Sequence, residues 1–449
     1  MATHPNLDDF KYFFAERFNI QKNVPPEEAL IHIVAMLPNI GGQGVLKCSP
    51  QSSKRLLEIA RRGLKSSNYA NQLSIDSVHR ELRKLVVEWF INLEKPINPS
   101  NTDKIVSKAI KNAATNLKTA VYYFPCHINF VETPANFSFG PVSFQTMSSF
   151  KKQFEAKTEA FIEGGRKTKQ VQVRRNLDKR LRSDFRTFSW VACVEVSDCE
   201  ASLAEVKARS VVTSSMHFIQ ALLGYKESEE MIVGGTGIVP NKQSHLVENV
   251  DGTIAICWQN RYHANEFSAD WWENLNSEGR DYFITGFGKV LSLELGNLST
   301  PPLVTRLIDA AAWYSEGIRD THPASRTIKF VTSIERIISS GESKCVTKSV
   351  TERTAALLLL VQDKSFEVIK KEMSVVYDIR SSYVHGTRSP KDIDFKKCIE
   401  SAEWLSRCVL WAALQFFEDG LEVRDYEITK LDKSFNRLVD WAKNAKSDV

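Results

Sequence analysis

The stretch FEVIKKEMSVVYDIRSSYVHGTRSP, residues 366–390, decides how the C-terminal part of this chain folds. Its apolar residues recur every three or four positions, which is the spacing of a helix with one buried face. Gly386, which tolerates left-handed backbone dihedrals, and Pro390 just beyond it predict that the helix ends there. We therefore expect a long helix whose last turn contains His385.

One cationic residue lies inside the apolar stripe of this expected helix. At roughly 100° per residue, Arg380 falls between Ile369 and Met373 on a helical wheel. A guanidinium in such surroundings needs a carboxylate, a phosphate or a partner surface. His385 falls about 140° away from Arg380 and about 7.5 Å further along the axis. This divergence favours either an unwound helix end or a site shared by two copies, although cations in a last turn are also an ordinary helix ending.

The whole chain is expected to be an α+β multidomain protein. Residues 1–117 have helical periodicity, including the segment PPEEALIHIVAML at 25–37, and indicate a helical N-terminal region. Residues 118–300 mix strand-like and helical segments, which predicts a mixed α/β middle domain that regulates or senses. The pair Pro301-Pro302 marks the last boundary, and residues 301–449 indicate an all-α bundle of about five or six helices.

Composition indicates the class of protein but does not indicate a function. The chain has 449 residues, 43% of them apolar and 25% charged, which indicates ordinary globular domains. No apolar run approaches the length of a membrane span, and no secretory leader is evident, so a soluble cytoplasmic protein is expected. The eight cysteines are scattered without ligand spacing. We interpret them as isolated thiols, and we expect neither a metal ion nor a cofactor.

Positive charge is concentrated in one tract. The net charge is only +5, yet residues 166–186 contain nine basic and two acidic residues, a local net charge of +7 that leaves −2 for the rest. Such a tract suits the phosphate backbone of RNA, and a solvated surface loop is the alternative. The candidate RNA-binding residues in this tract are Arg174, Arg175, Lys179, Arg180 and Arg182. Arg388, which follows the long helix, is a further candidate.

The segment YDIRSSYVHGTR at 377–388 resembles the R-x4-6-H motif of HEPN domains, in particular the Apea-like group. The upstream phrases SIERIISSG and VTERTAALLL are similar to earlier helices of the same group, so the resemblance covers roughly residues 320–420. It implies an HEPN-like C-terminal bundle that cuts RNA without a metal ion. It further implies a homodimer formed through this bundle, in which two motifs line one cleft.

The resemblance also implies roles for individual residues. His385 would act as general base or acid, and Arg380 would hold the phosphate. Asn or Asp often follows the motif arginine, whereas this chain has Ser381, whose hydroxyl would orient the imidazole less rigidly. Glu335 is the candidate partner of Arg380 through a buried bidentate contact. Asp378, Arg353 and Tyr383 are further supporting candidates, each with a purely structural role as its alternative.

By analogy of architecture, the leading interpretation is a ribonuclease effector of the antiphage defence or toxin kind. Its RNA substrate would be structured, with tRNA as the first candidate. The first 300 residues would sense a trigger or restrain the nuclease. The expected partners besides RNA are a phage-derived trigger or a neutralising protein. A non-catalytic HEPN scaffold that binds RNA or a protein is the alternative. A nucleotide-binding sensor is disfavoured because no phosphate loop is present.

Overall fold

The chain folds into two compact units in the computed structural model. Unit 1 comprises Met1–Ala120, Val196–Lys207 and Asn297–Ser299, and unit 2 comprises Val121–Glu195, Ala208–Gly296 and Thr300–Val449. The structure describes residues 4–23, 35–38, 45–48, 50–128, 135–153, 188–234, 242–248, 254–260, 270–339 and 346–444. Helices predominate and a small antiparallel sheet accompanies them, so the fold is α+β as the sequence predicted.

Unit 1 contains the expected N-terminal helices. They are α1 (Pro5–Asn23), α3 (Pro50–Lys65), α4 (Ile75–Val86), the π-helical turn η1 (Val87–Asn92) and α5 (Pro99–Ala114). Ser74 caps α4, because its side chain accepts a hydrogen bond from the Ser77 amide. Asn98 caps α5 in the same way, and Pro99 occupies the first helical position, where no amide hydrogen is needed.

The end of the predicted helix at 25–37 is wrong. Ala35–Pro38 forms strand β1, which pairs antiparallel with β2 (Val45–Cys48). Pro38 cannot continue a helical hydrogen-bond ladder, and it occupies the last position of β1, where a strand tolerates it. Pairing between two short segments is a long-range contact, which the period of apolar residues does not reveal. Residues 24–34 lie outside the described part of the chain.

Aromatic side chains of α1 anchor the core of unit 1. Phe10 and Phe14 both contact the Phe90 ring edge-on, with ring centroids 5.5 and 5.7 Å apart. Phe10 and Phe13 are almost completely buried, and they pack in one cluster with apolar residues of α3, α4 and α5. Offset and edge-on ring contacts of this kind add to the free energy of apolar burial. The four helices therefore form one hydrophobic core of their own.

The sheet has five strands in the order β4-β5-β6-β3-β7. Their bounds are β3 (Lys118–His127), β4 (Phe137–Phe139), β5 (Val142–Thr146), β6 (Trp190–Cys199) and β7 (Ile232–Val233). Strands β4 and β5 form a hairpin, and Gly140 in its turn adopts a positive φ of 55°. A Cβ at this glycine would lie 2.7 Å from the backbone oxygen of Gly288. This turn thus needs glycine both for its dihedrals and for its close approach to the helix that contains Gly288.

The remaining elements of the middle segment are helices and a hairpin. They are α8 (Ala201–Leu223), α9 (Tyr225–Ser228), β8 (Lys242–Glu248), β9 (Ile254–Asn260), α10 (Trp271–Leu275), η2 (Asn276–Arg280) and α11 (Asp281–Leu295). Strands β8 and β9 pair antiparallel. Helix α11 contacts both strand β4 and the C-terminal helices, so most of segments 118–300 and 301–449 share unit 2.

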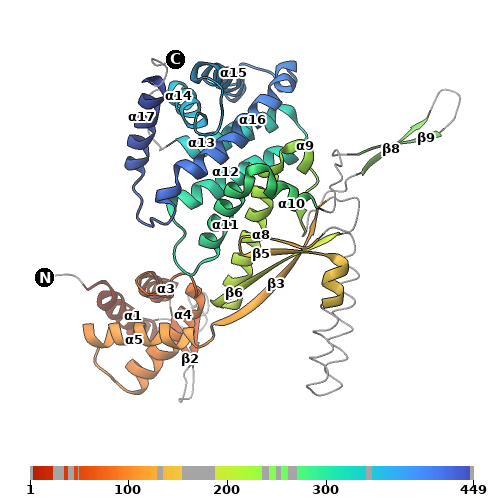
Figure 1. Ribbon diagram of the computed structural model, residues 1–449. Helices are drawn as coiled ribbons and strands as arrows, with labels where there is room; N and C mark the ends of the chain where they lie inside the picture. Colours follow the sequence, from red (N-terminus) through yellow and green to blue (C-terminus); the bar gives the residue numbers. More distant parts are fainter. Residues whose placement is uncertain are drawn as a thin grey trace. The chain divides into compact units, whose positions relative to one another are not determined.

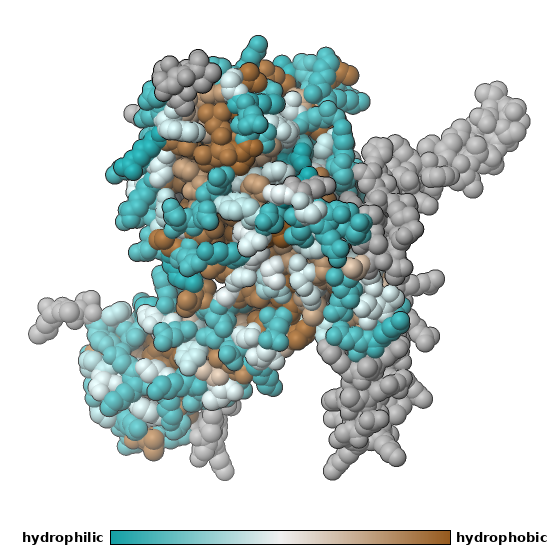
Figure 2. Space-filling model, viewed as in Figure 1, coloured by the Kyte–Doolittle hydropathy of each residue, from teal (hydrophilic) through white to brown (hydrophobic). Residues whose placement is uncertain are grey.

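The described residues of the C-terminal segment form helices, as their sequence predicts (Figure 1). They are α12 (Pro302–Arg319), α13 (Pro323–Ile338), α14 (Val346–Leu358), α15 (Phe366–Val384), α16 (Ile393–Phe416) and α17 (Ile428–Asn444). Helix α13 packs against α12, α15 and α16, while α14 packs against α15 and α17. Figure 2 shows hydrophilic residues over most of the visible bundle surface, with an apolar patch among them. The packing between α13 and α15 places these two helices side by side.

Candidate active site

Helix α15 presents a continuous apolar face to the bundle. Phe366, Ile369, Met373 and Val376 are all at most 2% exposed, and they repeat at the spacing of one helix face. Ser365 precedes the helix with extended dihedrals. This face is the apolar stripe identified in the sequence, and its burial places Arg380 beside α13.

The helix ends in a Schellman motif. Gly386 has a φ of 72°, and its amide donates to the Tyr383 carbonyl at 2.9 Å. The amide of Thr387 donates to the Ser382 carbonyl at 2.9 Å, which completes the paired hydrogen bonds of this motif. A Cβ on Gly386 would meet no atom within 4 Å. Glycine is therefore favoured here by its backbone dihedral and not by lack of space, and the predicted helix end is confirmed.

Arg380 has a carboxylate partner on α13. Its Nη2 donates to Glu335 Oε2 at 2.8 Å, and the two side chains are 22% and 18% exposed. The pairing expected from the sequence is confirmed, but the expected bidentate contact is wrong. The second carboxylate oxygen, Oε1, instead accepts a hydrogen bond from the Tyr377 hydroxyl at 3.1 Å. Arg380 Nε is buried and has no hydrogen-bond partner among the described residues.

Tyr377 is a site residue that sequence reasoning missed. It lies three residues before Arg380, so both side chains lie on one face of α15 and reach the same carboxylate. Burial and the nearby Glu335 carboxylate raise the pKa of Tyr377 to about 12, so the hydroxyl stays protonated and can donate to that carboxylate. The i, i+3 spacing of tyrosine and arginine was the available signal.

His385 lies at the exposed end of α15. Its backbone amide donates to the Ser381 carbonyl at 3.0 Å, and its φ of −85° and ψ of 5° keep it close to the helical path. The helix therefore does not unwind before His385, so the divergence of about 140° that an ideal helix gives still applies to this motif. No hydrogen bond joins the Ser381 hydroxyl to the imidazole in the part of the chain that the structure describes.

Two of the supporting candidates, Arg353 and Tyr383, contact residues of other helices in the bundle. Arg353 is 9% exposed and donates to the Ile338 carbonyl and to Asn436, and its Nη2 lies 2.8 Å from Asp432. It therefore links α14 to both α13 and α17, and within the described residues no hydrogen bond or ion pair joins it to Arg380 or Glu335. Tyr383 is half-buried and contacts the Phe395 ring edge-on at 5.6 Å. Each contact fits the structural alternative for that residue.

Asp378 and Arg388 lie nearer to solvent. Asp378 is exposed on α15. Arg388 is half-buried, with Nη1 3.2 Å from Asp394 and Nε 3.9 Å from Asp392. These two carboxylates offset much of the positive charge that Arg388 would offer to RNA. Its part in RNA binding stays a prediction.

The basic tract at 166–186 lies outside the described residues, and so do Arg174, Arg175, Lys179, Arg180 and Arg182. Within the described ranges, no group of three or more His, Cys, Asp or Glu residues is arranged to hold a metal ion. No described helix combines the length and the apolar character that crossing a bilayer requires.

The arrangement combines two chemical resources on one helix. Arg380 supplies a permanent cation whose position is fixed by Glu335, and His385 supplies a solvent-accessible group of the type that moves protons near neutral pH. In comparisons with known proteins, no family model, curated protein or solved structure matches the chain.

Proposed function

We propose that the C-terminal bundle is an endoribonuclease of the HEPN type, with Arg380 and His385 as its catalytic residues. The observation that supports it most directly is the geometry of Arg380. Its guanidinium is held on one side by Glu335, while 22% of the side-chain surface stays exposed. A guanidinium fixed in this way, with part of its surface open to solvent, suits a phosphate oxygen.

The reaction needs no group beyond those of the protein and the RNA. The 2′-oxygen of a ribose attacks the adjacent phosphorus, the bond from phosphorus to the 5′-oxygen breaks, and a 2′,3′-cyclic phosphate forms. His385 accepts the proton of the 2′-hydroxyl and, once protonated, donates a proton to the 5′-oxygen. Arg380 stabilises the negative charge that builds on the phosphorane oxygens.

Two copies of the chain would form the working unit. The divergence of Arg380 and His385 on one continuous helix means that a single phosphate is reached more readily by the arginine of one copy and the histidine of another. Helix α15 also carries exposed apolar residues, with Val375 and Val384 each 52% exposed, which a partner could cover.

In this proposal the residues before the C-terminal bundle sense a trigger or restrain the nuclease, and structured RNA such as tRNA is the substrate.

The direct test incubates the purified protein with total RNA in the presence of a chelator and maps new 5′-hydroxyl ends. His385→Ala is expected to reduce cleavage by about 10²–10⁴-fold, because the proton-transfer group is lost. The imidazole of His385 is exposed, so the variant should stay folded. His322→Ala, at another exposed histidine of the bundle, is the matched control and should cut normally. Equal cleavage by the parent and the His385→Ala protein would refute the catalytic assignment.

A mixing experiment tests the shared site separately. Arg380→Ala and His385→Ala proteins are each expected to be inactive, but after mixing and subunit exchange the heterodimer contains one intact site. Activity should return to about a quarter of the parental value when half of the dimers are mixed. No recovery in a sample shown by light scattering to contain heterodimers would remove the shared-site argument.

The alternative is a non-catalytic scaffold that binds RNA or a partner protein. The ion pair between Arg380 and Glu335 favours it in one respect, since a neutralised guanidinium is also a common structural element. RNA binding that survives in both the parent and the His385→Ala protein, without any cleavage, would support this scaffold.

A further inference from the structure

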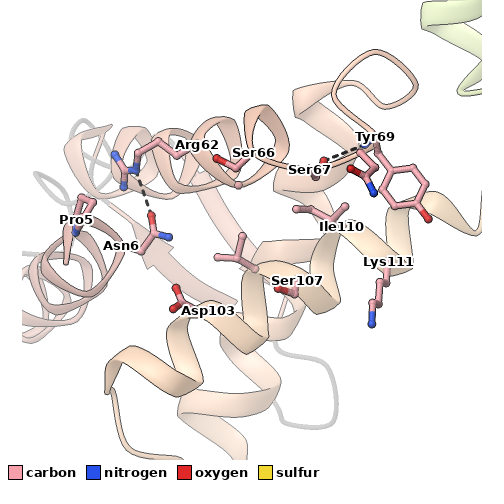
Figure 3. Close-up of a pocket in the computed structure, with 13 residues that line it drawn as sticks. Pro5, Asn6, Arg62, Ser66, Ser67, Tyr69, Asp103, Ser107, Ile110 and Lys111 are labelled. Carbon is pink, nitrogen blue, oxygen red and sulfur yellow. Dashed lines mark hydrogen bonds between the residues drawn. The ribbon is translucent and has the colours of Figure 1, made fainter. Parts of the chain in front are cut away.

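Unit 1 contains a pocket that the proposed ribonuclease activity does not use (Figure 3). It lies between the start of α1, the last turns of α3 with the loop that follows, and α5. Its volume of about 570 Å³ is in the range of cavities that bind small organic ligands.

The floor of the pocket is apolar. It depends on Gly63, a position of α3 that has no side chain. A Cβ on Gly63 of α3 would lie 2.3 Å from Val106 Cγ1, so this glycine lets α3 approach α5 closely. Val106 and Ile110 are 6% and 7% exposed and form the α5 side of the floor. A ligand seated here would cover apolar surface as well as polar groups.

Polar groups of both charges follow the α5 wall. Asp103, Ser107 and Lys111 are spaced by four residues, so they form one row along the helix. Asp103 and Lys111 are eight positions apart on the helix, so their backbones lie about 12 Å apart along its axis. One small ion cannot contact both ends at this separation, whereas an extended molecule with an anionic end and a hydroxylated end can.

The free donors are of the kind that recognise phosphate. Lys111 is exposed and makes no ion pair among the described residues, and the hydroxyls of Ser66 and Ser107 likewise have no hydrogen bond there. A lysine ammonium binds phosphate as a point charge, and serine hydroxyls can donate hydrogen bonds to the phosphate oxygens. Among the described residues that line the pocket, the single arginine is Arg62, which Asn6 and Asp9 already engage.

We propose that this pocket binds a small, hydroxylated organic phosphate ester of about the size of a nucleoside monophosphate. Its phosphate contacts Lys111 and Ser107, its apolar part covers Val106 and Ile110, and its sugar hydroxyls donate to Asp103. Asp103 Oδ2 lies 3.2 Å from His4 Nε2 and keeps its other oxygen for such a hydroxyl. This site is independent of the ribonuclease proposal, because all its residues belong to unit 1.

The test is isothermal titration calorimetry of the full chain with AMP, ribose 5-phosphate, adenosine and inorganic phosphate as separate probes. AMP or ribose 5-phosphate should bind at least about 10-fold more tightly than adenosine or inorganic phosphate, since each of the latter reaches one end only. Lys111→Glu should weaken binding by about 10-fold or more. Lys104→Glu, an equal charge change at an exposed position of α5 outside the pocket, should leave it unchanged.

A second variant blocks the pocket without removing charge. Ser107→Trp places a large side chain at an exposed position of α5, so it should abolish binding while the circular dichroism spectrum stays that of the parent. The proposal is overturned if neither phosphate ester binds the parent protein. It is equally overturned if binding is the same in the parent, Lys111→Glu and Ser107→Trp proteins, since the probe would then occupy another place.

Discussion

The contact between Glu335 and Arg380 should make an unusually large contribution to local stability for a helix-to-helix ion pair. Glu335→Gln removes the negative charge and leaves one amide oxygen where two carboxylate oxygens now accept from Arg380 and Tyr377. Exposed ion pairs contribute about 0–1 kcal/mol, while leaving a buried charge unpaired costs about 3–5 kcal/mol. Side chains that are 22% and 18% exposed lie between these limits, so we expect a loss of about 2 kcal/mol.

Hydrogen exchange of peptides from α13 and α15, measured by mass spectrometry, is the suitable assay because a chain of two units need not unfold in one step. A loss of about 2 kcal/mol corresponds to roughly 30-fold faster exchange in these peptides. Glu372→Gln is the matched control on α15. Its carboxylate pairs with Lys364 at 3.1 Å, with side chains 34% and 42% exposed, so exchange should change by no more than about two-fold.

A double-mutant cycle separates the ion pair from general damage. Arg380→Gln removes the charge that Glu335→Gln leaves unpaired, so the double variant should be no less stable than Glu335→Gln alone. The reasoning is wrong if Glu335→Gln exchanges like Glu372→Gln, or if the two changes at the pair simply add.

Three further outcomes follow from the same helices. Tyr377→Phe should lower the free energy of unfolding by about 1 kcal/mol near pH 8 through the lost hydrogen bond. Because the pKa of Tyr377 is raised to about 12 in the folded protein, the unfolded state loses this proton first, and the parent should lose stability between about pH 10 and 12. The gap between the two proteins in thermal unfolding should therefore close over that range, and a constant gap would contradict the raised pKa. Gly386→Ala should cost about 1 kcal/mol through its φ of 72°, and Gly386→Asn clearly less, as thermal unfolding would show; equal effects would exclude a left-handed residue there. Arg353→Lys should speed hydrogen exchange in α14 and α17 by about 10-fold, since lysine cannot reproduce the contacts to Asn436 and Asp432, and it should leave RNA cleavage unchanged. Loss of cleavage in a folded Arg353→Lys protein would show that this arginine supports the site after all.

Much of the fold could be predicted because the information is local. The apolar period of residues 366–384 indicates both the helix and its buried face, and Gly386 indicates its end. The same period placed Arg380 on the buried side before any partner was known. Local signals were misleading at Ala35–Pro38, where pairing with Val45–Cys48 prevailed over helical periodicity. Strand pairing depends on a second segment, which no single window of sequence contains.

Spacing along the sequence identified Arg380 as a residue that needs a partner, and the packing of the helices selected that partner. An arginine in an apolar stripe requires a compensating group, so Arg380 could be singled out from spacing alone. That Glu335 divides its oxygens between Arg380 and Tyr377 depends on the packing of α13 against α15, across 45 and 42 residues of chain. The engagement of Arg353 by α17 likewise follows from how separate helices meet. Periodicity records the face that a helix buries, whereas the neighbour on that face is selected by the free energy of packing the whole bundle.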